Sequence, residues 1–422
     1  MSKFIINQSD ELKGKIKISG SKNSVLPIIA ATLLTNEECI INDVPALTDV
    51  FTMQNLIKDF GADISFNEDK ETLKISIKDI ISTHTSYELC SKLRASFLVA
   101  GPMLARQGEV KVSLPGGCAI GSRPVDLHLK GFAALGADIN QEHGYIHVKA
   151  KKLKGANIYL DFPSVGATEN IIMAATLAQG QTIIQNCAIE PEIVDLSNFL
   201  SSMGAQIRGS GTDTVRINGV DKLYGTTHSV IPDRIEAGTF MIASAITGGD
   251  IILENIVIDH IKPLIAKLNE ANVGIDSLDD GIRVYNMGKR KQIDIKTMPY
   301  PGFPTDMQAQ FVAMLATTSG TNVVTETVFE NRFMHIAELV RMGADIKIDS
   351  RSAIIEGVEK LAGSKVKATD LRAGAALILA ALKADGTTEV NDIYHIDRGY
   401  HNFDKKLRYL GADIIRVNES QY

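Results

Sequence analysis

The chain of 422 residues contains no tryptophan, and only 6% of its residues are aromatic. Nucleic acids bind to basic surfaces and aromatic platforms, so this scarcity and the net charge of -6 argue against a nucleic-acid partner. The four cysteines are too few for a disulfide framework, and no two of them have metal-ligand spacing. Cys39, Cys90 and Cys187 are typical of buried, inert thiols.

No apolar run is long enough to cross a bilayer, and the N-terminus lacks the apolar core of a signal peptide. We therefore expect a cytoplasmic protein with no membrane partner, and nothing indicates an obligate protein partner. The motifs of phosphate loops, dinucleotide folds, serine hydrolases, zinc proteases and calcium loops are also missing. The sequence predicts neither a metal ion nor a cofactor.

What the sequence does contain is a sixfold repeat. An amphipathic helix that ends in glycine or asparagine recurs, with the terminating residue at positions 61, 136, 204, 272, 343 and 411. Asn272 is the one departure from glycine, and asparagine is the next-best residue for a left-handed helix cap. Each unit also has an alanine-rich helix that is apolar nearly all round, as buried helices are. These helices are expected at residues 24–34, 96–105, 170–178, 237–246, 307–316 and 373–382.

One unit spans about 70 residues, so the chain holds six units, which indicates two domains of three units each. We expect an α/β architecture in which the alanine-rich helices fill each interior and sheets and amphipathic helices surround them. Two N-terminal strands, at residues 4–6 and 15–18, are surplus to the repeat. We expect them to complete the second domain, although periodicity alone does not decide this.

The loop from Leu114 to Pro124 contains three glycines and two prolines, which work against regular structure. Cys118 lies in this loop, and Arg123 follows five residues later. A backbone-permissive loop with a thiol and an anion-binding guanidinium is typical of a lid that closes over a charged substrate.

Cations stand at the starts of several predicted buried helices, where the helix dipole disfavours them. They are Lys22, Arg94, Arg234 and Arg372. Arg123 and Arg398 each lie 13 residues before the terminating glycine of their unit, and Arg332 lies 11 before its own. These side chains are either solvated charges or parts of a converging anion site.

Asp306 follows a stiff segment with three prolines, at the start of the fifth buried helix. Aspartate at this place is either a helix N-cap or a carboxylate held as a general base. Spacing does not separate the two interpretations.

These residues resemble the family of UDP-N-acetylglucosamine enolpyruvyl transferases. The matching segments run from Ser19 to Tyr400, and the most specific are residues 115–128, 299–310 and 330–335. Ser21 and Ser122 stand where the family usually has alanine. The resemblance implies an inside-out α/β barrel with two domains, residues 22–230 and residues 1–21 with 231–422, and an active site in the cleft between them.

The resemblance also implies a reaction. The enolpyruvyl group of phosphoenolpyruvate would pass to the 3-hydroxyl of UDP-N-acetylglucosamine through a tetrahedral intermediate, with release of phosphate. This is the first committed step of peptidoglycan synthesis. Cys118 would donate a proton and could carry a covalent adduct, Asp306 would act as base, and Lys22 and Arg398 would complete the catalytic set.

Two substrate sets follow from the same resemblance. The phosphoenolpyruvate set is Lys22, Asn23, Arg123, Arg332, Arg372 and Arg398. The nucleotide-sugar set is Asn23, Arg94, Arg123, Pro124, Val125, Asp126, Leu127, Ser164, Val165, Gly166, Asp306 and Val328. One alternative is 5-enolpyruvylshikimate-3-phosphate synthase, whose lid lacks the Pro-Gly-Gly-Cys sequence. The other, a non-catalytic regulatory paralogue, is disfavoured because Cys118, Asp306 and the arginines are retained.

Overall fold

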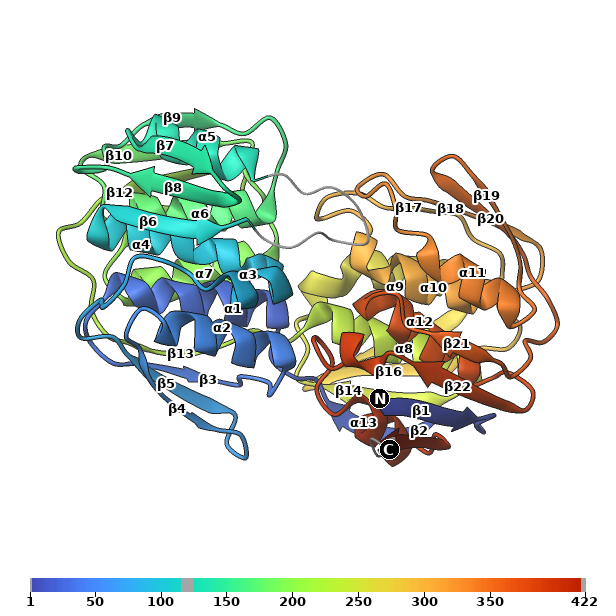
Figure 1. The fold of residues 1–422 in the computed structure, drawn as a ribbon. Helices are drawn as coiled ribbons and strands as arrows, with labels where there is room; N and C mark the ends of the chain where they lie inside the picture. Colours follow the sequence, from blue (N-terminus) through green and yellow to red (C-terminus); the bar gives the residue numbers. More distant parts are fainter. Residues whose placement is uncertain (1, 115–124, 419–422) are drawn as a thin grey trace. The chain divides into compact units, whose positions relative to one another are not determined.

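The computed structural model describes residues 2–114 and 125–418 (Figure 1). Cys118, Arg123 and Pro124, which the sequence analysis singled out, lie outside the described residues. The chain divides into two compact units. Described residues 20–114 and 125–231 form what we call the N-terminal unit, and residues 2–19 and 232–418 form the C-terminal unit.

The interior of the N-terminal unit is built from the alanine-rich helices that the repeat predicts. They are α1 (Lys22–Ala31), α4 (Ala100–Gln107) and α6 (Val165–Ala175). The amphipathic helices are α2 (Thr48–Lys58), α5 (Asp126–Ala134) and α7 (Pro191–Ser202), and α3 (Tyr87–Lys92) is an additional short helix. Side chains from both classes of helix and from the sheets form one hydrophobic core.

The described part of this unit contains three sheets. The first has the order β13 (Thr227–Ser229), β3 (Cys39–Asn42), β5 (Thr72–Ser76), β4 (Asp63–Asn67). The second is β6 (Glu109–Ser113), β8 (Tyr145–Lys149), β7 (Asp138–Glu142). The third is β11 (Gln206–Arg208), β12 (Thr214–Asn218), β10 (Gln181–Gln185), β9 (Asn157–Tyr159).

The C-terminal unit repeats this arrangement with its own core, and its inner helices lie within a shell of strands (Figure 1). The inner helices are α8 (Arg234–Thr247), α10 (Gln308–Leu315) and α12 (Leu371–Ala381), and the amphipathic ones are α9 (Lys262–Glu270), α11 (Met334–Arg341) and α13 (Phe403–Tyr409). Close packing requires small residues inside: a Cβ added to Gly238 of α8 would lie 2.6 Å from Leu264 and 2.9 Å from Met307.

Both N-terminal strands pair within sheets of the C-terminal unit. β1 (Ser2–Asn7) is antiparallel to both β22 (Thr387–Asn391) and β23 (Ile414–Asn418), and β21 (Lys365–Lys367) completes that sheet. β2 (Lys13–Lys17) is parallel to β14 (Asp250–Glu254), beside β16 (Gly281–Asn286) and β15 (Val273–Leu278). The remaining sheet has the order β17 (Ile295–Lys296), β18 (Thr321–Thr325), β20 (Ser352–Glu356), β19 (Asp345–Asp349).

The predicted left-handed caps are confirmed at all six terminating residues, where φ runs from 65° at Asn272 to 103° at Gly204 and Gly411. Asn272 also donates from Nδ2 to the carbonyls of Met287 and Lys289, at 3.2 and 3.1 Å. A side-chain amide that also binds backbone explains why asparagine fits this position.

The helix predicted at residues 96–105 differs from the structure, which has a 3-10 segment over Arg94–Val99 before α4. The cause is Asn170 of α6. Its Nδ2 donates to the carbonyl of Phe97 at 2.8 Å, and its Oδ1 accepts the amide of Gly101 at 2.6 Å. These two groups would bond each other in a continuous α-helix, so the inserted side chain replaces that bond.

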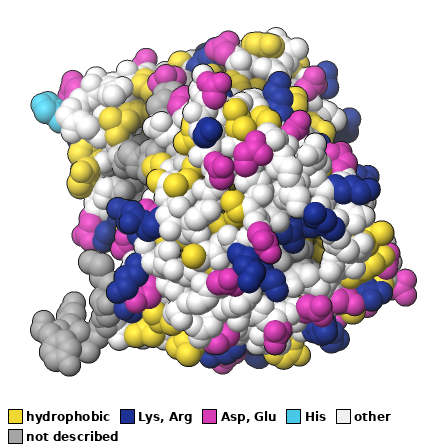
Figure 2. Space-filling view, turned by 90° about the vertical axis from the view of Figure 1, so that its right-hand side faces the viewer, with side chains coloured by type: hydrophobic (Ala, Val, Ile, Leu, Met, Phe, Trp, Pro, Cys, Tyr) yellow, Lys and Arg dark blue, Asp and Glu magenta, His cyan; other side chains and the backbone are white. Residues whose placement is uncertain are grey.

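On the face shown in Figure 2, lysine and arginine side chains are interspersed with aspartate and glutamate. Within residues 2–114 and 125–418, no helix is both long and apolar enough to span a bilayer.

Candidate active site

Asp306 is the centre of a charged cluster in the C-terminal unit. It lies in a 3-10 turn, Thr305–Met307, that leads into α10. Arg332, which precedes α11, donates from Nη2 to Oδ1 at 2.8 Å. Arg372, in the first turn of α12, donates from Nη2 and Nε to Oδ2 at 2.9 and 3.2 Å. Three segments far apart in the sequence therefore place one carboxylate between two guanidinium groups.

The N-cap interpretation of Asp306 is wrong. The cap residue of its turn is Pro304, and no side chain caps the turn. Asp233 and Asp370, by contrast, accept backbone amides at the starts of α8 and α12 and are genuine N-caps. The carboxylate of Asp306 is thus available to the arginines instead of the helix.

The electrostatics of the cluster keep Asp306 ionised. Burial would by itself raise the pKa of Asp306, but the charges of Arg372 and Arg332 outweigh burial and hold that pKa well below its ordinary value. Both arginine side chains are 4% exposed, whereas the Asp306 side chain is 27% exposed. The carboxylate of Asp306 is therefore partly accessible to a ligand, whereas the two arginine side chains are buried.

Each arginine retains one buried donor. The Nη1 atoms of Arg332 and Arg372 are inaccessible to water and have no hydrogen-bond partner within the described part of the chain. Buried guanidinium donors are almost always satisfied, and carboxylate or phosphate groups suit them best. The arrangement is suited to an anion beside Asp306.

Tyr400 was noted in the sequence only as the end of the matching segments, and its ring contacts the guanidinium group of Arg372. Its ring centre lies 5.4 Å from Cζ of Arg372, and its hydroxyl bonds Thr239 at 2.8 Å and Gln310 at 3.2 Å. Burial raises the pKa of Tyr400, which keeps the ring neutral. A single tyrosine among polar residues carries no local signal of this contact.

Two histidines near the arginines have pKa values below the ordinary value, which favours their neutral form. His335 is 1% exposed, and burial lowers its pKa to about 4. His395 also has a lowered pKa, through burial and then through the charge of Arg398. Arg398 is half-buried, in the segment between the 3-10 turn Ile393–His395 and α13.

In the N-terminal unit, Lys22 is the first residue of α1 and Asn23 the second. Nζ of Lys22 lies 3.3 Å from Oδ2 of Asp49, and the two side chains are 14% and 4% exposed. Asp49, in the first turn of α2, was missed by the sequence analysis because an acidic residue there is ordinary for a helix start. The ion pair fixes Lys22 at the N-terminal end of an inner helix.

Three predicted nucleotide-sugar segments lie close together in the same unit. Gly166 is the second residue of α6, whose N-cap is Ser164, and a Cβ on Gly166 would lie 3.3 Å from the ring of His128. Burial, and then the charge of Arg94, lower the pKa of His128 to about 3. His128 belongs to α5, which starts with the predicted residues 126 and 127 just after buried Val125. The N-terminal ends of α5 and α6 and the segment before α4 are therefore neighbours.

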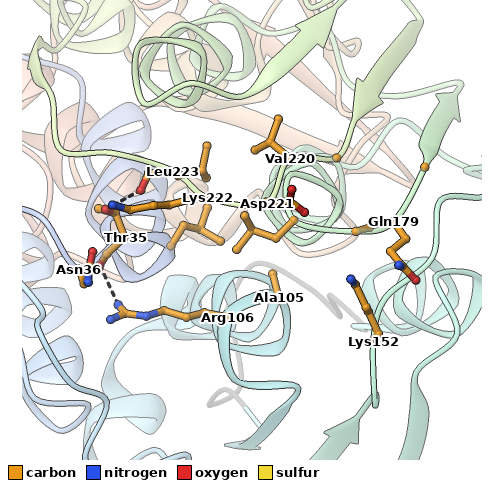
Figure 3. A pocket seen from close by; sticks show the side chains of 15 residues that line it. Thr35, Asn36, Ala105, Arg106, Lys152, Gln179, Val220, Asp221, Lys222 and Leu223 are labelled. Atoms are coloured by element: carbon orange, nitrogen blue, oxygen red, sulfur yellow. Dashed lines mark hydrogen bonds between the residues drawn. The ribbon is translucent and has the colours of Figure 1, made fainter.

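Residues at or just after the C-terminal ends of the inner helices α1, α4 and α6 line a cavity of about 630 Å³ (Figure 3). Arg106 projects there from α4, but its donors bind the carbonyls of Leu33, Thr35, Ile77 and Lys78 at 2.7 to 3.2 Å. Arg106 therefore holds the segment after α1 and the segment after β5 together. The lining residues include none of the predicted substrate-binding residues.

Val328 lies in the C-terminal unit, in the loop that follows β18. Its amide donates to the carboxylate of Glu326 at 2.7 Å. Among the described residues, no group of three or more histidine, cysteine, aspartate or glutamate side chains is arranged to hold a metal ion.

Comparison with known proteins gives consistent results. The family model described as EPSP synthase (3-phosphoshikimate 1-carboxyvinyltransferase) matches residues 6–407. A UDP-N-acetylglucosamine 1-carboxyvinyltransferase 1 of Caldanaerobacter subterraneus subsp. tengcongensis is 61% identical over 98% of this chain and 99% of its own. A UDP-N-acetylglucosamine 1-carboxyvinyltransferase 2 of Carboxydothermus hydrogenoformans is 59% identical over 99% of this chain and 100% of its own.

Among solved structures, the enolpyruvyl transferase NikO from Streptomyces tendae aligns with a TM-score of 0.90 at 22% identity, over 99% of each chain. An EPSP synthase from Acinetobacter baumannii aligns with a TM-score of 0.78 at 19% identity, over 99% of this chain and 100% of the other. At these identities the likeness concerns the fold, and it confirms the predicted α/β barrel class.

Proposed function

Since this chain belongs to the enolpyruvyl transferase family, and its relatives named UDP-N-acetylglucosamine 1-carboxyvinyltransferase match over nearly its whole length, we propose that it has the transferase activity that this name states. It transfers the enolpyruvyl group of phosphoenolpyruvate to the 3-hydroxyl of UDP-N-acetylglucosamine and releases phosphate. This is the first committed step of peptidoglycan synthesis, and we propose that it takes place in the cytoplasm.

The observation that carries the proposal is the cluster of Asp306, Arg332 and Arg372. Phosphoenolpyruvate has a carboxylate as well as a phosphate, and two guanidinium groups beside a partly exposed aspartate suit such a carboxylate. The acceptor hydroxyl must lose a proton, and Asp306 is an ionised, partly exposed carboxylate at the same place. The cluster thus combines an anion site with a proton acceptor.

A carboxylate with a depressed pKa is a weak base, and binding of the substrate anion would raise the pKa of Asp306. When the phosphoenolpyruvate carboxylate shares the two arginines, it offsets part of the positive charge that holds the Asp306 pKa down. The pKa of Asp306 then rises toward its ordinary range, and its power to accept the hydroxyl proton increases. Asp306 is therefore activated when the anion is bound.

The remaining steps use the other predicted residues. The sugar oxygen forms a bond to C2 of phosphoenolpyruvate while C3 gains a proton, for which Cys118 is the proposed donor because an ordinary thiol is largely protonated at neutral pH. Breaking the bond from C2 to the phosphate oxygen releases phosphate, and loss of a proton from C3 restores the double bond and forms the enol ether product. Lys22 and Arg398 bind the phosphate and its growing charge.

Nucleotide-sugar binding is assigned to both units. Arg94, the start of α5 and the start of α6 would hold it in the N-terminal unit, and Val328 with Asp306 in the C-terminal unit. Since Lys22 and Asp306 belong to different units, the mechanism requires both units to act on one pair of substrates. We keep the predicted division at residues 21/22 and 230/231 as part of this proposal.

The test is phosphate release measured with phosphoenolpyruvate and either UDP-N-acetylglucosamine or shikimate 3-phosphate. Release with phosphoenolpyruvate and UDP-N-acetylglucosamine, but not with phosphoenolpyruvate and shikimate 3-phosphate, supports the proposal. The opposite result favours 5-enolpyruvylshikimate-3-phosphate synthase. Cys118→Ala should abolish most turnover and remove alkylation by the epoxide fosfomycin. Undiminished activity of that variant would exclude Cys118 as proton donor.

A further inference from the structure

Glu326 is a buried carboxylate that the mechanism above does not use. It follows β18 and is 1% exposed. Its Oε1 accepts the Thr297 hydroxyl at 2.8 Å and the amides of Val328 and Phe329 at 2.7 and 3.2 Å. Its Oε2 accepts the Thr305 hydroxyl at 2.7 Å. Both oxygens are therefore bound, and the carboxyl group is held from several sides.

Three of the four partners of Glu326 belong to the candidate site or contact it. Thr305 immediately precedes Asp306 in the same 3-10 turn. Val328 belongs to the proposed nucleotide-sugar set. The Phe329 ring centre lies 5.4 Å from Cζ of Arg332, and Arg332 binds Asp306. One buried carboxylate thus connects the base, an arginine that binds the base, and the sugar-contact loop.

We propose that Glu326 is a positioning residue that fixes the turn carrying Asp306 relative to the Val328 loop. The inference rests on the proposed function, because only then must a sugar hydroxyl reach Asp306 while its nucleotide contacts this loop. A buried group that ties both segments keeps that separation constant. Misplacement by about 1 Å can slow a reaction by about a hundredfold.

Thr297 strengthens the same connection from the strand side. Its hydroxyl donates to Glu326 and also accepts the amide of Thr327 at 2.9 Å, so the loop is fixed at successive residues. Thr297 and Glu326 are both buried, and the hydrogen bonds of the Asp306 carboxylate to described residues go to Arg332 and Arg372. Their influence on the reaction must pass through Thr305 and the loop amides.

The sharpest experiment compares Thr305→Val with Thr305→Ser. Valine has the shape of threonine but lacks the hydroxyl, whereas serine keeps it. We expect Thr305→Val to lower kcat by about ten- to a hundredfold and Thr305→Ser to remain within about threefold of wild type. Equal kcat values for the two variants, whether both normal or both impaired, would overturn the inference.

Glu326→Ala should lower kcat and raise KM for UDP-N-acetylglucosamine by about tenfold or more, with a smaller change in KM for phosphoenolpyruvate. The matched control is Glu338→Ala. Glu338 is 6% exposed on α11 of the same unit and accepts the Lys367 amide at 3.3 Å, and it has no bond to the Asp306 turn. We expect the control to lower thermal stability while leaving kcat near wild type.

A Glu326→Ala variant that loses stability like the control but keeps wild-type kinetics would show a merely structural role. If Glu326→Ala fails to fold, the Thr305 pair decides the question alone. Wild-type protein without enolpyruvyl transfer to the nucleotide sugar would instead overturn the proposed function, so the two failures are distinguishable.

Discussion

Asp306→Asn removes the one negative charge that two buried arginines share, while keeping the shape of the side chain. Losing one partner of a buried ion pair costs about 3–5 kcal/mol, because the remaining charge is left uncompensated. The Asp306 side chain is 27% exposed, so water screens part of this loss. We expect the free energy of unfolding to fall by about 2 kcal/mol, which for a unit of this size lowers Tm by about 4–8 °C.

The loss should depend on pH in a defined direction. Because the folded-state pKa of Asp306 is depressed, its contribution is complete above the unfolded pKa, which is about 3.9, and is lost as pH falls through the lower folded value. The stability difference between wild type and Asp306→Asn should be constant from pH 8 to 5 and narrow below about pH 4. Thermal unfolding across this range measures it.

The same variant tests the chemistry. We expect kcat to fall by about 10²- to 10⁴-fold, because an amide does not accept the hydroxyl proton. Binding of UDP-N-acetylglucosamine, measured by calorimetry, should be largely kept. A near-normal kcat would refute Asp306 as the base, and a stability difference as large at pH 3 as at pH 7 would refute the ion-pair argument.

Three further predictions concern single residues. Arg372→Lys should raise KM for phosphoenolpyruvate by about tenfold or more and change KM for the nucleotide sugar little, because lysine lacks the planar fork; equal rises in both would contradict this. Burial lowers the His335 pKa to about 4, so wild-type stability should decline from pH 6.5 toward 4, by up to about 1.4 kcal/mol per pH unit. Urea unfolding of His335→Asn at pH 7, 6 and 5 should show a smaller decline, and an unchanged slope would exclude His335 as the source. Asn272→Ala should cost about 1–2 kcal/mol and Asn272→Gly less, because alanine both loses two bonds and strains a φ of 65°; the opposite order in thermal unfolding would refute the cap.

Part of the candidate site could be predicted without the fold. Lys22, Arg94 and Arg372 stand at inner helix starts, where cations are unexpected enough to be noticed. Asp49 and Tyr400 could not be found in this way, because an acidic first turn and a single aromatic residue are ordinary local features. Glu326 likewise looks like any charged residue after a strand until its four hydrogen-bond donors are seen.

The sequence by itself determined the repeat, the left-handed caps and the inner helices, because each depends on residues within one or two turns of each other. The tertiary structure alone decided that Asp306 binds arginines 26 and 66 residues away. It also decided that Asn170 opens the helix bond between Phe97 and Gly101. Such contacts depend on how helices pack against one another, and side-chain periodicity along one helix does not contain that information.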